Sequence, residues 1–170
     1  MKIKTMDDLF LEQIADLYDA EQRLVKALPK MAEASTSQAL RDAIESHLEQ
    51  TKGHVSRLER IFGELGKDAK GQTCEAMKGL VKEGEDTIGE ISNILLRDAG
   101  IIAAGNRVEH YEIAAYGSAK SFAKTLGLHG VVALLEQTLR EEKEADQILT
   151  RLAESMVNEQ ALRAGELQAR

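Results

Sequence analysis

The amino-acid sequence predicts an all-α protein, an antiparallel four-helix bundle with one long crossover that contains a short helix. The 170 residues include one Pro and no Trp, and aromatic residues make up 4%. This composition favours helices and leaves few residues suited to strands. Four long segments repeat apolar residues at the helical period, and a shorter segment separates the second from the third. This order of elements is typical of a bundle whose two hairpins are joined by a long connection.

The first helix is expected over residues 5–34, because Thr5 can cap it and two acidic residues follow within the first turn. Pro29 predicts a kink or a weakened last turn. Glu21 falls inside the apolar stripe of this helix. The stripe consists of Phe10, Ile14, Leu17, Leu24, Leu28 and Met31.

The second helix is expected over residues 38–65, after a polar break that supplies its cap. His47 and His54 lie on one flank of its core face, whereas Glu49 projects away from that face. The core face itself consists of Leu40, Ile44, Leu48, Val55, Leu58 and Phe62.

The connection to the third helix starts with a glycine-rich loop over residues 63–71. A shorter crossover helix is expected over residues 73–86. Asp98 then predicts the cap of a third long helix over residues 99–125, which Gly127 ends as the C′ residue.

The third helix carries acids in its apolar stripe, which consists of Ile91, Leu95, Ile102, Glu109, Ile113 and Tyr116. Glu109 lies near the middle of this stripe, and Glu112 lies at its edge. A carboxylate in a core stripe costs several kcal/mol unless a partner compensates its charge. Both residues are therefore candidates for a polar site, although Glu112 also fits a solvated surface acid.

The fourth helix, expected over residues 130–156, repeats this feature. Glu142 and Asp146 lie one turn apart in the centre of a stripe formed by Val131, Leu135, Leu139, Leu149, Ala153 and Met156. Residues 158–170 are polar with few apolar anchors, so we expect a frayed C-terminal tail after a bundle domain over residues 1–157.

The acids on three or more helices lie midway along their segments, so they can meet at one level of the bundle. The core stripes offer no Arg or Lys to pair with them. Carboxylate oxygens with an imidazole nitrogen suit iron or manganese. The predicted metal ligands are Glu21, His47, Glu109, Glu112, Glu142 and Asp146.

The ligand from the second helix stays open among His47, His54 and Glu49. A histidine on the flank of a core face also fits an ordinary buried or exposed residue. Glu49 is the weaker candidate because the helical phase turns it outward.

The net charge is −7, and Lys and Arg form no cluster. We therefore expect no binding to nucleic acid, which requires clustered positive charge. No apolar run approaches the roughly 20 residues that span a bilayer, so we expect no membrane segment. Cys74 is the only cysteine, which precludes an intrachain disulfide and fits a reducing cytoplasm.

Several segments resemble the YciE/YciF family of bacterial stress-associated proteins over nearly the whole chain. They are Asp19-Ala20-Glu21-Gln22, His47-Leu48-Glu49-Gln50-Thr51, Cys74-Glu75-Ala76-Met77, Val108 to Tyr116, and Glu141-Glu142-Lys143 with Asp146. The resemblance implies a ferritin-like bundle related to rubrerythrin, a homodimer and a dinuclear metal site.

The sequence departs from ferritin-like di-metal proteins, in which two helices each carry Glu-x-x-His. Here Glu49 is followed three residues later by Lys52, and Glu142 by Ala145. The site is therefore incomplete by this standard, unless His47 supplies the missing nitrogen.

Two hypotheses follow. The first is a di-iron, or alternatively di-manganese, carboxylate protein that reacts with dioxygen or peroxide and takes electrons from an external donor. The second is a homodimeric structural or interaction protein with a vestigial or partial metal site and no catalysis. A mini-ferritin that shields DNA is a weaker alternative because the chain has no basic tail.

Overall fold

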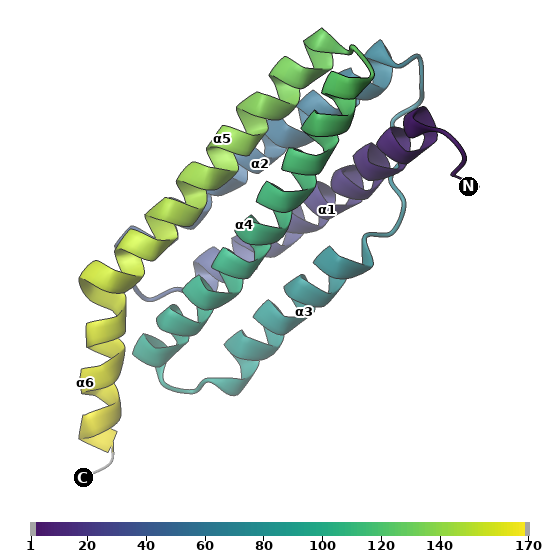
Figure 1. Cartoon of the computed structure of the whole chain (residues 1–170). Coiled ribbons are helices and arrows are strands. Elements are labelled where there is room, and N and C mark those ends of the chain that lie inside the picture. Colours follow the sequence, from purple (N-terminus) through teal and green to yellow (C-terminus); the bar gives the residue numbers. More distant parts are fainter. Residues whose placement is uncertain (1–2, 169–170) are drawn as a thin grey trace.

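The computed structural model describes residues 3–168 and consists of helices joined by short turns and one longer loop (Figure 1). No strand occurs among these residues, and the all-α prediction is confirmed. The elements are α1 (Met6–Ala34), α2 (Gln38–Glu64), α3 (Glu75–Glu90), α4 (Ile94–Thr125), α5 (His129–Leu152), the π-helical turn η1 (Ala153–Val157) and α6 (Asn158–Gln168).

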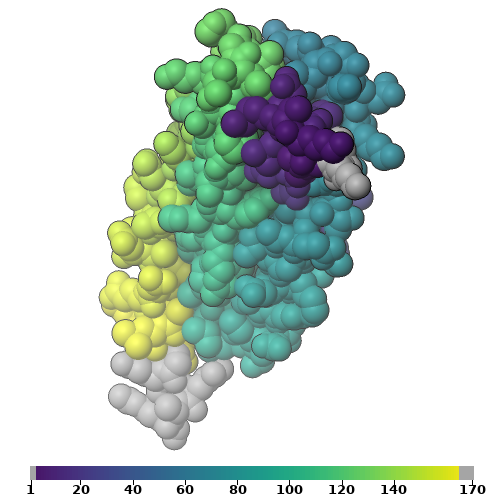
Figure 2. All heavy atoms as spheres, turned by 45° about the vertical axis from the view of Figure 1, so that its right-hand side comes forward, coloured from purple at the N-terminus to yellow at the C-terminus, as the bar shows by residue number. Residues whose placement is uncertain are grey.

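Helices α1, α2, α4 and α5 form the predicted four-helix bundle. Figure 1 shows α1 and α2 as one antiparallel hairpin and α4 and α5 as another. Contacts of α1 with α4 and of α2 with α5 close the bundle. The crossover carries α3, which packs against α1 and α4. In Figure 2 the atoms of α3 lie along one side of α4, and the C-terminal part of the chain lies on its other side.

The helix ends largely follow the local sequence. Thr5 caps α1 in a reciprocal capping box with Asp8, and the Ser37 side chain caps α2. Gly127 adopts a φ of 73° just after α4, as expected for a C′ glycine. Helix α1 runs through Pro29 without interruption.

The prediction that Asp98 caps the third long helix is wrong. Helix α4 begins earlier, at Ile94, and the Asn93 side chain caps it. Asp98 lies inside α4, where it is buried and accepts hydrogen bonds from the backbone N–H groups of Thr36 and Ser37 at 2.8 and 2.7 Å. It therefore ties the turn between α1 and α2 to α4, a contact across more than 60 residues that helical periodicity does not reveal.

The C-terminal segment, for which the sequence predicts a frayed tail over residues 158–170, is helical as far as Gln168, and residues 169–170 lie outside the described part of the chain. After α5 the chain widens into η1 and continues as α6, which contacts α4. Val157 and Ala161 are buried, and Leu152, Ala153 and Met156 pack against the core beside them.

The bundle interior has two apolar halves separated by a polar layer. One half lies around Phe10, Phe62 and Leu135, and the other lies around Leu28, Ile44 and Ile101. Between them the four helices turn acids and histidines inward. No helix in the described part of the chain is long and apolar enough to cross a membrane.

We predict that Asp98→Ala lowers the free energy of unfolding by about 3 kcal/mol, because the backbone N–H groups of Thr36 and Ser37 both lose a buried, charged acceptor. Denaturant unfolding followed by circular dichroism measures this change. The matched control is Asp86→Ala, which removes an exposed ion pair with Lys82 and should cost less than about 1 kcal/mol. Equal effects of the two substitutions would contradict the role assigned to Asp98.

Candidate metal centre

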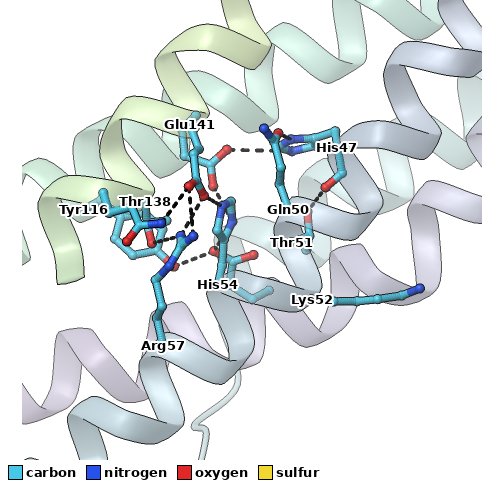
Figure 3. Close-up of polar contacts among 12 residues, drawn as sticks. His47, Gln50, Thr51, Lys52, His54, Arg57, Tyr116, Thr138 and Glu141 are labelled. Carbon is cyan, nitrogen blue, oxygen red and sulfur yellow. Dashed lines mark hydrogen bonds and ion pairs between the residues drawn. The ribbon is translucent and has the colours of Figure 1, made fainter.

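The polar layer is built from all four helices of the bundle. Its members are Glu21 on α1, His47 and His54 on α2, Glu109 and Glu112 on α4, and Glu142 on α5. None of them is more than 7% exposed. His47 and His54 are seven residues apart, which is two helical turns, so both side chains leave α2 on the same face. Figure 3 shows them directed into the bundle, whereas Lys52 extends away from it.

These side chains form two overlapping groups that could each hold a metal ion. The first group is His47, Glu109, Glu112 and Glu142, and the second group is Glu21, His54 and Glu142. Within each group the candidate ligand atoms all lie within 4.8 Å of one another. Glu142 belongs to both groups, so its carboxylate would be a ligand common to them.

Most of the inward-facing atoms of the polar layer have no hydrogen-bond partner among the described residues. Both carboxylate oxygens of Glu112 and of Glu142 are unpaired, as are Glu21 Oε2, Glu109 Oε2, His47 Nε2 and His54 Nδ1. Some of these atoms are close to one another, but without hydrogen-bond geometry. His54 Nδ1 lies 2.9 Å from Glu142 Oε1, and His47 Nε2 lies 3.3 Å from Glu109 Oε1.

Buried polar atoms in folded proteins almost always have partners, and each unpaired one costs about 1–3 kcal/mol. Eight such atoms converging on one layer call for a ligand that the protein itself does not supply. Cations that accept several oxygen and nitrogen donors satisfy this requirement directly.

The electrostatics of the layer lead to the same conclusion. Burial raises the pKa of Glu109, Glu112 and Glu142 above the ordinary value, and neighbouring carboxylates add to the effect. His47 and His54 lower the pKa of Glu109 and Glu142, respectively, without cancelling the rise. In the absence of added positive charge these acids are driven to hold protons, whereas metal ions would allow them to ionise.

His54 is held by a hydrogen-bonded chain that extends outward from the layer (Figure 3). Its Nε2 lies 2.9 Å from Glu141 Oε2, and Arg57 donates to both oxygens of Glu141 at 2.6 and 2.8 Å. Burial alone would raise the pKa of Glu141, but its hydrogen bonds with Arg57 and Gln137 lower it overall. An ionised Glu141 accepts a hydrogen bond from the Nε2–H group of His54, so Nδ1 is the nitrogen that would offer its lone pair to a metal ion in the second group.

His47 presents the other ring nitrogen, Nε2, to the polar layer. Its Nδ1 lies 3.3 Å from Gln50 Oε1, and its Nε2 faces Glu109 and Glu142. The Thr51 hydroxyl donates to the His47 carbonyl oxygen at 2.9 Å. With Nδ1 donating to Gln50, Nε2 presents its lone pair to the first group.

Tyr116 extends the layer on the side of Glu21. Its buried hydroxyl donates a hydrogen bond to Glu21 Oε1. Burial raises the pKa of Tyr116, and the nearby Glu21 and Glu112 carboxylates raise it further, so the hydroxyl keeps its proton. Tyr116 therefore positions one oxygen of Glu21 and leaves Oε2 available.

The structure brings together five of the six predicted ligands, namely Glu21, His47, Glu109, Glu112 and Glu142. The prediction that Asp146 shares the core face with Glu142 is wrong. Asp146 is only partly buried, accepts a hydrogen bond from Asn106 at 2.7 Å and lies 3.2 Å from His110 Nε2. Four residues correspond to about 400°, so Asp146 is rotated by about 40° from Glu142 towards α4.

Of the alternatives left open on α2, both histidines reach the layer. Glu49 is exposed and pairs with Lys52 on the surface, as its helical phase predicted. Sequence patterns did not predict the supporting roles of Arg57, Glu141 and Gln50. The spacing of Gln50, three residues after His47 on one helix, could have indicated their contact. The contact of Arg57 with Glu141 spans 84 residues, so no local spacing indicates it.

The donor set fits a dinuclear metal centre. It contains four carboxylates and two imidazoles, which is the total that ferritin-like di-metal proteins obtain from two Glu residues and two Glu-x-x-His motifs. Here both histidines come from α2 and two of the acids come from α4. The same set of donors is therefore distributed over the four helices differently than in ferritin-like di-metal proteins.

Residues 5–162 match the model of a family described as a domain of unknown function, DUF892. The chain belongs to the DUF892 family. Protein YciF of Escherichia coli K12 is similar to this family member, with 40% identity over 95% of this chain and 98% of its own length.

Solved structures of similar proteins share the fold. The crystal structure of the E. coli stress protein YciF matches with a TM-score of 0.88 over 92% of this chain and 99% of that chain, at 40% identity. YcfI of Rhodopseudomonas palustris matches with a TM-score of 0.86 over 88% and 95% of the two chains, at 44% identity. The resemblance to the YciE/YciF family and the ferritin-like bundle are therefore confirmed.

We predict that the metal-free protein loses stability as the pH rises. Burial lowers the pKa of His54, but its contacts with Glu142 and Glu21 outweigh burial and raise it from 6.5 to about 10. A histidine whose pKa is higher in the folded state stabilises fully below pH 6.5, and this contribution is lost as the pH rises through about 10. Chelated protein should lose several kcal/mol of unfolding free energy between these values, since each unit of pKa shift corresponds to about 1.4 kcal/mol.

Denaturant unfolding of chelator-treated protein across this pH range measures the loss. His54→Gln should flatten the profile, whereas His129→Gln, at an exposed position, should leave it unchanged. A profile that is the same for wild type and His54→Gln would refute the assignment.

Proposed function

We propose that this protein is a ferritin-like carboxylate protein that holds two iron ions, or alternatively two manganese ions, in its polar layer and reacts with dioxygen or peroxide. The observation that carries the proposal is the convergence of eight unpaired buried donor atoms on six side chains. Iron and manganese are favoured over softer metals because four of the six ligands are carboxylates. The description of the relative YciF as a stress protein supports a protective role.

The two groups correspond to the two ions. His47, Glu109 and Glu112 would hold one, Glu21 and His54 would hold the other, and Glu142 would bridge them. Bound ions of this kind supply reversible redox chemistry towards dioxygen or peroxide. Electrons must come from an external donor, since the chain has a single cysteine and no metal-binding cysteine cluster.

The protein's own residues prepare this layer in three ways. Glu141 and Gln50 fix which nitrogen of each histidine faces inward. Tyr116 holds Glu21 by one oxygen. The apolar halves of the bundle above and below the layer exclude bulk water, which strengthens the electrostatic contacts within it.

Metal content per chain, measured by mass spectrometry on protein without a His-tag after anaerobic Fe(II) loading, tests this proposal. We expect about two ions per chain in wild type, as a dinuclear centre requires. Glu142→Ala should lose most of both ions because it removes the shared ligand. Glu21→Ala should lose chiefly one, and the exposed Glu49→Ala is the matched control that should keep both.

The alternative function, a homodimeric structural protein with a vestigial site, predicts other results. Wild type would hold well under one ion per chain even after loading. Chelation would then leave the melting temperature unchanged, and Glu142→Ala would be at least as stable as wild type, because it removes a buried acid. These three outcomes together would overturn the di-metal proposal.

A further inference from the structure

A cavity of about 360 Å³ lies inside the bundle next to the polar layer. It occupies the half of the bundle where α1 leads into α2 (Figure 1) and is bounded by all four helices. Its volume is within the range of small-molecule sites, which begins at about 300 Å³. The body of the cavity is aliphatic, with walls that include Leu28, Met31, Ile44, Ile101 and Leu149.

One end of the cavity reaches the candidate metal centre. His47 and Glu109 both line it, and Gln50 stands beside them. His47 Nε2 and Glu109 Oε2 are buried atoms without hydrogen-bond partners in the described part of the chain. The cavity therefore joins an apolar chamber to the edge of the polar layer that His47 and Glu109 form, an arrangement typical of a ligand site, in which a mainly apolar wall carries a few polar groups.

Two alanines leave room in the walls, since Ala43 and Ala145 line the cavity from α2 and α5. Gly105 lines it from α4, where it lets Leu149 pack closely, because a Cβ atom there would lie 2.9 Å from Leu149 Cδ1. In a Glu-x-x-His motif that starts at Glu142, a histidine would stand at position 145. The methyl group of Ala145 leaves that volume open, and His47 provides a nitrogen donor to the layer from α2 instead.

The rim of the cavity selects against anions. Asp42 and Glu144 line it and are exposed, together with Ser46. No Lys or Arg is among the lining residues in the described part of the chain. A ligand with a carboxylate or phosphate would therefore meet negative charge at the entrance and no cationic side chain in the walls.

We propose that this cavity binds a small, uncharged, mainly aliphatic molecule, such as a medium-chain alcohol or aldehyde, with its polar end at His47 and Glu109. A reaction of this ligand rests on the proposed metal function, but binding does not. The aliphatic walls supply the affinity through burial of apolar surface, and the polar end fixes the orientation of the ligand.

Fluorescence titration with the neutral apolar probe N-phenyl-1-naphthylamine tests the site on metal-free and Fe(II)-loaded protein. We expect one probe per chain, displaced by 1-octanol but not by octanoate. Ala145→Leu and Ala43→Leu, which fill the cavity from two helices, should each weaken probe binding at least tenfold. Ala133→Leu, at an exposed position of α5, is the matched control and should have no effect.

Circular dichroism shows whether Ala145→Leu or Ala43→Leu impairs folding. If one of them does, the other still tests the cavity. Probe binding that is absent, or that neither filling substitution weakens, would overturn the proposal, and displacement by octanoate equal to that by 1-octanol would overturn the ligand class. Metal content in the same samples separates the two hypotheses. Two ions without probe binding refute only the cavity, and probe binding without metal refutes only the proposed metal function.

Discussion

The burial of four carboxylates and two imidazoles in one layer is the constraint on which the rest of the structure depends. Each buried acid without compensation would cost several kcal/mol, yet in the described part of the chain no Arg or Lys forms an ion pair with any of these six side chains. The apolar halves on either side must therefore stabilise the bundle enough to tolerate this cost. Aliphatic residues would pack in this layer at a lower cost in free energy of folding. Buried acids with strongly shifted pKa values are therefore expected where they perform a function.

The supporting contacts show how strongly the layer is specified. His54 is tied through Glu141 to Arg57, and His47 is oriented by Gln50, so each ring presents a defined nitrogen to the interior. Ligand histidines in metal sites are commonly oriented by such outer partners. Compared with ferritin-like centres, the inventory of donors is the same but the second histidine has moved from α5 to α2. Ala145 lines the cavity at the position where a Glu-x-x-His motif would place its histidine, which connects the donor arrangement to the proposed ligand site.

Helical periodicity predicted the bundle and most of the layer because both depend on local spacing. Glu21, Glu109 and Glu142 were predictable because each interrupts an apolar stripe. Asp146 was misplaced because a rotation of 40° decides whether a side chain faces the core or the neighbouring helix. The bond from Asp98 to the α1–α2 turn and the pairing of Arg57 with Glu141 could not be predicted, since each joins residues far apart in sequence.

The most direct test of the central claim is a crystal structure of Fe(II)-loaded protein with anomalous diffraction data collected on both sides of the iron absorption edge. Two iron peaks in the polar layer, both in contact with the Glu142 carboxylate and one beside each histidine, are the predicted result. A layer without any iron peak, in which the acids instead pair with one another through shared protons, would contradict the account.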